Sequence, residues 1–182
     1  ATFHDDGGDS LPLDGQQPYR TAWDALGDLA VPNDVEDLKT RGRWADLLPS
    51  IPEGHNYLHH TARGDGLPLF GWRRRFWSFL LKLAKNRPSW TLMAQPGPAI
   101  GPFHWTSRRL SRLELARLQT FPEGYVVGGS AGEVQRQIGN AVPSLLGEIL
   151  GRAVMAQLLD RKPVGSHLTL LPPRRESLPG PE

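Results

Sequence analysis

The last third of the chain carries apolar residues at helical spacing. Between residues 143 and 159 they recur every three or four positions, which places them on one face of an α-helix. They are Leu145, Leu146, Ile149, Leu150, Ala153, Val154 and Leu158. The pattern predicts an amphipathic helix that begins near Pro143 and has an apolar face to cover.

Two shorter helices are predicted just upstream by their starting residues. Ser111 and Glu114 form an S-x-x-E capping box, in which each side chain satisfies a backbone N–H group at the helix start. FPEG at residues 121–124 ends this helix. A second S-x-x-E box predicts a short helix over residues 130–137.

The first hundred residues show a weaker pattern. Residues 1–18 are rich in Gly, Asp and Pro and indicate an extended connection. Hydrophobic spacing and breaker residues predict helices over 19–30, 34–48 and 76–84, and short strands over 89–94 and 103–105 joined by a Gly/Pro loop at 95–101.

Cysteine is absent from the 182 residues. This absence excludes disulfides, cysteine zinc sites and a thiol nucleophile within the chain. No apolar run approaches the length of a membrane span, and the acidic N-terminus lacks the basic and apolar regions of a signal peptide. The first residue is not Met, so we expect the chain to have been cut from something longer.

Charge is concentrated in the middle of the chain. Residues 71–117 hold ten Lys or Arg and one acidic residue, a net of +9, whereas residues 1–70 have a net of −7. A basic segment of this kind suits nucleic acid, although a solvated surface is the plain alternative. The candidate DNA contacts are Arg73, Arg74, Arg75, Lys82 and Lys85.

The three consecutive arginines stand among aromatic residues. Trp72 precedes them and Phe76 and Trp77 follow. We expect these aromatic rings to be mostly core and at least one arginine to meet a phosphate group. Lys82 and Lys85 fall in the last turn of the helix predicted over 76–84, where cations suit the helix dipole.

Three histidines lie close together in sequence, at His55, His59 and His60. A ligand pair four residues apart needs a helix, and Gly54 with its flanking loop residues argues against one. A third ligand has no evident source. We therefore expect surface or packing histidines and no metal site.

Two motifs near the C-terminus resemble those of a known family. RLSRLELARLQTFP at 109–122 is similar to the R-x-L-(T/S)-x-x-E-x-x-R-L-Q-x-F-P pattern of the DNA cytosine-5 methyltransferases. QIGNAVP at 137–143 resembles the Q-x-G-N-A-V-P pattern of the same family, in the same order. Taken singly, each motif is also compatible with an ordinary capped helix.

The resemblance implies an α/β fold, mixed α and β in this chain alone. Residues 1–105 would be the target-recognition region and 106–160 the closing motifs that pack on the catalytic domain. Residues 161–182 are rich in proline, with PP and PGP among them, and predict a disordered tail. The closing helices would complete a Rossmann-like domain that uses S-adenosylmethionine. Without its partner, the apolar face of the helix at 143–159 would need cover, for example by self-association.

The same resemblance implies roles for particular residues. Asn140 and Ala141 would line the S-adenosylmethionine pocket, with Gln137 and Gly139 shaping the turn before them. A free helix start at Pro143 would suit the carboxylate of that cofactor, although Asn140 could instead only cap the helix. Thr91 would touch the DNA backbone near the target base.

The family attacks cytosine with a cysteine thiolate, which this chain lacks. The glycine-rich, Pro-Cys and Glu-Asn-Val motifs of the family are also missing, and in it they precede the recognition region. We therefore expect a cytoplasmic, DNA-associated part of a methyltransferase that needs an N-terminal catalytic half. The alternatives are a non-catalytic DNA-binding module or regulator from that family, and an interaction scaffold without a DNA role.

Overall fold

The computed structural model describes residues 18–30, 37–162, 165 and 167–180. Their elements are α1 (Ala22–Leu26), the 3₁₀ helices η1 (Ala45–Ser50) and η2 (Tyr57–His60), α2 (Arg112–Leu118), α3 (Ala131–Asn140) and α4 (Ser144–Gln157). These residues contain isolated β-bridges but no strand. The α/β class expected from the resemblance is therefore not confirmed by the elements of this chain.

The helices predicted from capping boxes are confirmed. α2 begins after Ser111 and α3 after Ser130, and in both the box is complete in each direction. α1 lies within the helix predicted over 19–30 and starts with a further box between Thr21 and Asp24. The helix predicted over 143–159 is confirmed as α4. Local sequence decided these helices because their starting N–H groups are satisfied by side chains three residues away.

The helix predicted over 76–84 is wrong. Leu80 has a φ of 53°, outside the helical region. The N–H groups of this segment bond distant carbonyls instead: Leu80 to Ala99 at 2.8 Å and Leu83 to Phe103 at 2.8 Å. Residues 79–85 are buried, so long-range pairing overrides the local helical spacing.

Three other expectations fail or change. The helix predicted over 34–48 is wrong for residues 37–44, which are irregular. The 3₁₀ helix η1 starts only at Ala45, and residues 34–36 lie outside the described part. Residues 89–94 form no strand, and in 103–105 only Phe103 makes an isolated bridge, to Lys82. The extended connection expected over 1–18 lies outside the described residues except for Pro18. A single bridge to each neighbour is too little pairing to make a sheet.

Two hydrophobic clusters form the core. The first joins residues from α1, α2 and α3 to Leu83, Leu92 and Trp105. The second lies among residues 44–103 around Tyr57, Phe79 and Phe103. The predicted boundary at residue 105 does not separate the two clusters, because the first contains side chains from both sides of it.

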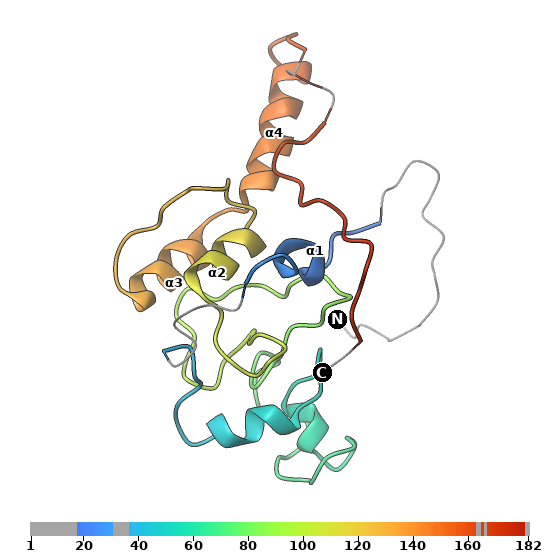
Figure 1. The fold of residues 1–182 in the computed structure, drawn as a ribbon, viewed down its shortest axis with the longest axis vertical. Coiled ribbons are helices and arrows are strands. Elements are labelled where there is room, and N and C mark those ends of the chain that lie inside the picture. The colour runs from blue at the N-terminus through green and yellow to red at the C-terminus, as the bar shows by residue number, and fades with distance from the viewer. Residues whose placement is uncertain (1–17, 31–36, 163–164, 166, 181–182) are drawn as a thin grey trace.

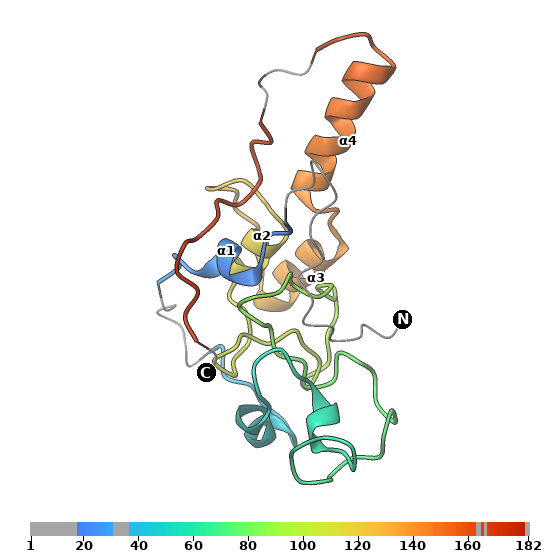
Figure 2. The same ribbon diagram turned by 90° about the vertical axis from the view of Figure 1, so that its right-hand side faces the viewer.

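α4 extends away from the rest of the molecule in both ribbon views (Figures 1 and 2). None of its residues is buried, and the apolar face predicted from its spacing is exposed at Leu146, Ile149, Leu150 and Val154. None of the helices in the described ranges is long and apolar enough to cross a membrane.

Of the disordered tail predicted for residues 161–182, the described part comprises residues 161–162, 165 and 167–180. These residues run back along the molecule from the end of α4 (Figure 1). Glu148 accepts hydrogen bonds from the N–H groups of Thr169 and Leu170, and Asp24 accepts one from the N–H group of Arg175 at 3.0 Å. Side-chain acceptors on α1 and α4 therefore hold a segment that has no regular structure of its own.

Candidate nucleic-acid and cofactor interface

The Gln119 side chain joins the two motifs. Its Nε2 group donates to the carbonyl oxygen of Ile138 at 3.0 Å and to that of Ala141 at 3.4 Å. Gln119 is buried, so its amide group gives these two carbonyl oxygens the hydrogen bonds that water would otherwise provide. The end of α2 therefore fixes the end of α3 and the connection that follows it.

The start of α4 is held by the same part of the chain. The N–H group of Ser144 donates to the carbonyl oxygen of Gln119 at 3.0 Å, and that of Leu145 donates to Thr120 Oγ1 at 2.8 Å. The sequence predicts free N–H groups here for an anionic ligand. Two of them are already bonded, so a carboxylate does not need to satisfy them.

α3 is longer than the sequence predicts and changes the setting of Asn140. It ends at residue 140 and not at 137, so Gln137 and Gly139 lie within its last turns and do not shape a loop. Pro143 occupies the N-cap of α4 without a side-chain cap. Asn140 therefore does not cap α4. Burial of Ile138 in the first core cluster explains why the helix continues.

Gly139 lies directly against the segment that follows Thr91. A Cβ atom at position 139 would stand 2.5 Å from both the N and the Cα of Ala94. The Gln135 Nε2 group donates to the carbonyl oxygen of Met93 at 2.6 Å. α3, which ends at the predicted cofactor residue Asn140, therefore packs on the segment that carries the predicted DNA-contact threonine.

The predicted phosphate-contact residues of the loop lie on the surface. Arg73, Arg74, Arg75 and Thr91 are all exposed. The Trp77 and Trp90 rings have centroids 5.6 Å apart, which brings the loop at 73–77 beside residues 90–91. The structure thus places the three arginines and the threonine on neighbouring segments, although they are sixteen or more positions apart in sequence.

Lys82 and Lys85 do not lie on this surface. Both are 3% exposed. Lys82 Nζ donates to the carbonyl oxygen of Ile51 at 2.9 Å, and Lys85 Nζ donates to that of Gly180 at 2.9 Å and forms an ion pair with Glu53 at 3.4 Å. Neither ammonium group can meet a phosphate in this arrangement, because each is enclosed and engaged by the protein itself.

The aromatic residues of the loop also differ from expectation. Phe76 is 82% exposed and Trp77 is 52% exposed, whereas the sequence predicts that they are mostly core. Trp72 is half-buried. Because the segment is not a helix, Phe79 turns into the second cluster and leaves Phe76 on the surface.

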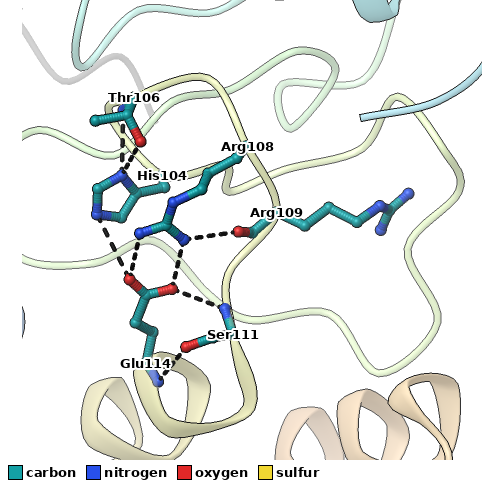
Figure 3. A network of polar contacts seen from close by, with 6 residues as sticks. All are labelled: His104, Thr106, Arg108, Arg109, Ser111 and Glu114. Atoms are coloured by element: carbon teal, nitrogen blue, oxygen red, sulfur yellow. Dashed lines mark hydrogen bonds and ion pairs between the residues drawn. The ribbon is translucent and has the colours of Figure 1, made fainter. Parts of the chain in front are cut away.

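A buried ionic network sits under the first motif (Figure 3). Arg108 donates two hydrogen bonds to the carboxylate of Glu114, at 2.8 and 2.6 Å, and the N–H group of Ser111 donates a third at 2.7 Å. Burial alone would raise the pKa of Glu114, but the bonds from Arg108 and Ser111 outweigh it and lower that pKa. The glutamate of the motif is thus both helix cap and anchor for a buried arginine.

His104 completes this network. Its Nε2 lies 3.6 Å from Glu114 Oε1, and its Nδ1 shares a hydrogen bond with Thr106 Oγ1 at 2.7 Å. Burial, followed by the positive charge of Arg108, lowers the pKa of His104 to about 4, against the opposing effect of Glu114. The imidazole is therefore neutral at pH 7.

Two of the three neighbouring histidines, His60 and His55, bond other groups of the protein. His60 is buried and bonds Ser50 Oγ at 2.7 Å and the carbonyl oxygen of Leu67 at 3.1 Å. His55 bonds the carbonyl oxygen of Glu53. Within the described ranges, no group of three His, Cys, Asp or Glu is placed to hold a metal ion.

The residues at the end of α3 fit a ligand with polar groups. Asn140 is exposed, and its amide makes no hydrogen bond with any described residue. An amide can both donate and accept, so it is available to a polar ligand. The Ala141 carbonyl oxygen is held by Gln119, which fixes the backbone beside that amide.

Sequence reasoning missed the joining role of Gln119 and Thr120. A clue was present: Gln119 stands four residues after Leu115, on the buried face of α2, where a polar side chain needs a partner. It also missed Asn56 and Tyr57, which hold the arginine loop from beneath. Nothing in their spacing links them to a loop some twenty residues away.

In this structure the two motifs bond to each other beside an exposed basic loop, and comparisons with known proteins show the family of the chain. Residues 64–156 match the model of the C-5 cytosine-specific DNA methylase family. The chain belongs to this family. By its description, this family acts on carbon 5 of cytosine in DNA.

Three curated relatives are named as methyltransferases, and one of them is named as a DNA (cytosine-5-)-methyltransferase. The chain is 45% identical over 152 residues to Type II methyltransferase M.SacI of Streptomyces achromogenes, covering 78% of the chain and 38% of the relative. It is 34% identical over 135 residues to Type II methyltransferase M.NgoFVII of Neisseria gonorrhoeae, covering 71% and 34%. It is 38% identical over 122 residues to DNA (cytosine-5-)-methyltransferase M.ApeKI of Aeropyrum pernix, covering 63% and 24%.

The chain therefore spans at most about two fifths of the length of these relatives. No solved structure matches it.

Proposed function

We propose that this chain is the DNA-recognition and cofactor-edge part of a DNA cytosine-5 methyltransferase. The observation that carries the proposal is the contact between Gly139 and Ala94. It joins the Q-x-G-N-A-V-P motif to the segment with Thr91, so one rigid unit would present both a cofactor edge and a DNA-contact surface. We infer that the Rossmann-like domain that these elements would complete belongs to the length of the relatives that this chain does not match.

The catalytic nucleophile has to come from outside these 182 residues. They contain no cysteine, and the family reaction needs a thiolate that attacks cytosine. We infer that an N-terminal catalytic half, corresponding to the unmatched length of the relatives, supplies it. The apolar face of α4 is the surface that this half would cover, with self-association of the chain as the alternative cover.

The cofactor S-adenosylmethionine supplies the methyl group when bound. We propose that Asn140 contributes its free amide and Ala141 its fixed backbone to one wall of that pocket. Gln119 and Thr120 keep this wall in place, because they hold the end of α3 and the start of α4. This support is a pre-organised backbone, and not the open helix start that the sequence predicts.

We propose that Arg73, Arg74, Arg75 and Thr91 contact the phosphate backbone of duplex DNA. Their exposure on neighbouring segments supports this role. Lys82 and Lys85 remain predicted contacts from the sequence, but their burial gives them no support.

Binding to duplex DNA at several salt concentrations tests this proposal. Replacing the three arginines at 73–75 by alanine should reduce the slope of log affinity against log salt by roughly 0.9 for each phosphate group that is no longer neutralised. The charge-matched control replaces Arg112, Arg161 and Lys162, which are exposed elsewhere. Equal slopes for the two triple variants would show that the loop has no special role in DNA binding.

The second candidate is a non-catalytic DNA-binding module derived from the same family. The absence of cysteine favours it, since the chain lacks the nucleophile of its relatives. This second candidate predicts that the chain binds DNA but that no methylation follows, even when a catalytic half is supplied.

A further inference from the structure

Phe76 is the most exposed aromatic side chain of the basic loop. Its relative exposure is 82%, although it stands directly after Arg75 and before Trp77. Exposing a phenylalanine ring to water costs free energy relative to burying it. The sequence around it is cationic, which disfavours an apolar protein partner and suits a polyanion.

The backbone on each side of Phe76 is anchored from beneath. Tyr57 Oη donates to the carbonyl oxygen of Arg75 at 3.0 Å, and Asn56 Nδ2 donates to the carbonyl oxygen of Trp77 at 2.8 Å. Tyr57 and Asn56 are 2% and 3% exposed. Two buried polar side chains thus hold the residues before and after Phe76, and the ring is presented outward from a fixed backbone.

The other aromatic rings nearby are already engaged. Arg63 and Arg73 lie over the Trp72 ring, at 4.9 and 5.6 Å from its centroid. Trp77 contacts Trp90. Among the described residues, no ring or cation lies against Phe76, so its two faces are available for stacking.

We propose that Phe76 stacks on a base of the bound duplex, beside the phosphates held by the arginines at 73–75. The inference rests on the DNA-binding role proposed above and assigns a contact with the bases to this loop. An aromatic ring on a fixed backbone loses little conformational entropy when it stacks, and every base offers a face to it. A ring that stacks in this way needs a base stack that opens, so Phe76 should favour DNA whose stacking is weakened.

The test compares two short duplexes with the unaltered 182-residue chain. One is fully paired, and the other has a single mismatch next to 2-aminopurine, whose fluorescence rises when it unstacks. The unaltered chain should bind the mismatched duplex more tightly and raise the 2-aminopurine fluorescence. Phe76→Ala should weaken binding to it by about ten-fold and abolish both the preference and the fluorescence change.

Two further variants separate stacking from simple apolar contact. Phe76→Trp should retain the mismatch preference, and Phe76→Leu should lose it, because only the first keeps an aromatic face. Val126→Ala is the matched control, since Val126 is 86% exposed on another loop. The thermal midpoints of all these variants should be unchanged, because neither side chain is buried.

Two results would count against different statements. The stacking role alone would be overturned if the salt slope depended on the arginines while Phe76→Ala bound with the same affinity as the unaltered chain. Equal retention of binding by the Leu and Trp variants would also overturn it. An unaltered chain that binds neither duplex would contradict the proposed function itself.

Discussion

The side chain of Gln119 donates a hydrogen bond to the carbonyl oxygen of Ile138 at 3.0 Å. Gln119 belongs to the first motif and Ile138 to the second, so this bond joins two motifs across nineteen residues of the chain. The C-terminus of α2 thereby sets where α3 ends and α4 begins. The residues proposed for the cofactor edge, Asn140 and Ala141, are positioned by this bond and by the bond from Gln119 to the carbonyl oxygen of Ala141.

Replacing Gln119 by alanine should destabilise the fold by about 1–3 kcal/mol, because the carbonyl oxygens of Ile138 and Ala141 lose the hydrogen bonds from its buried amide. Chemical denaturation followed by circular dichroism measures the free energy of unfolding. Gln157→Ala is the matched control, since Gln157 is exposed on α4 and should change stability little. Equal effects of the two substitutions would show that the join between the motifs is not important for stability.

Replacing Gly139 by alanine should also be destabilising, by about 1–3 kcal/mol, because the new methyl group would collide with the Ala94 backbone. Gly132, in the same helix, has no atom within 4 Å of an added Cβ. Gly132→Ala should therefore be neutral or stabilising, since alanine favours helix. Thermal unfolding of the two variants measures the difference, and a Gly139→Ala variant as stable as Gly132→Ala would contradict the close approach of α3 to residues 93–94.

The chain should lose stability as the pH falls from 6.5 towards 4. His104 has a pKa of about 4 when folded and 6.5 as an ordinary histidine, so in this window the unfolded state binds a proton that the folded state does not. The loss should reach about 3 kcal/mol at the lower end. Below pH 4.5 Glu114 adds to it, because its folded pKa is also lowered.

Unfolding free energies of His104→Gln measured across this range should show a flatter pH profile than those of the unaltered chain. His167→Gln, which removes an exposed histidine, should leave the profile unchanged. A profile for His104→Gln as steep as that of the unaltered chain would show that the buried imidazole is not the group responsible.

Asn140 should affect cofactor binding without affecting the fold. In a methyltransferase whose matched region is replaced by this chain, Asn140→Ala should weaken the Kd for S-adenosylmethionine by up to about ten-fold, the worth of one hydrogen bond. The thermal midpoint without cofactor should not change, because the amide bonds no described residue. Asn86→Ala is the control, because Asn86 is also an exposed asparagine but lies outside α3. Calorimetry giving the same Kd for both variants would remove Asn140 from the cofactor wall.

The sequence predicted the helices that are started by side chains close by in the chain, and it missed the contacts between residues that are far apart in the chain. The starts of α2 and α3 can be predicted from four consecutive residues each, because the capping boxes are formed by Ser111 with Glu114 and by Ser130 with Glu133. The segment 76–84 has helical spacing, but its N–H groups bond residues such as Ala99 and Phe103, which spacing cannot reveal.

The same distinction applies to the candidate site. The two motifs could be recognised from their residues, and so could the basic character of the loop at 73–77. The exposure of Phe76 and the burial of Lys82 and Lys85 could not be predicted, because they depend on which face a non-helical segment turns inward. Asn56 and Tyr57 act on that loop only through the fold.

Transfer of a tritium-labelled methyl group from S-adenosylmethionine to duplex DNA tests the central claim most directly. We predict that the chain alone gives no transfer above background, since it has no cysteine. A chimera in which this chain replaces the matching region of M.SacI should methylate DNA. Turnover by the chain alone, or a folded and cofactor-binding chimera that never methylates DNA, would contradict the account.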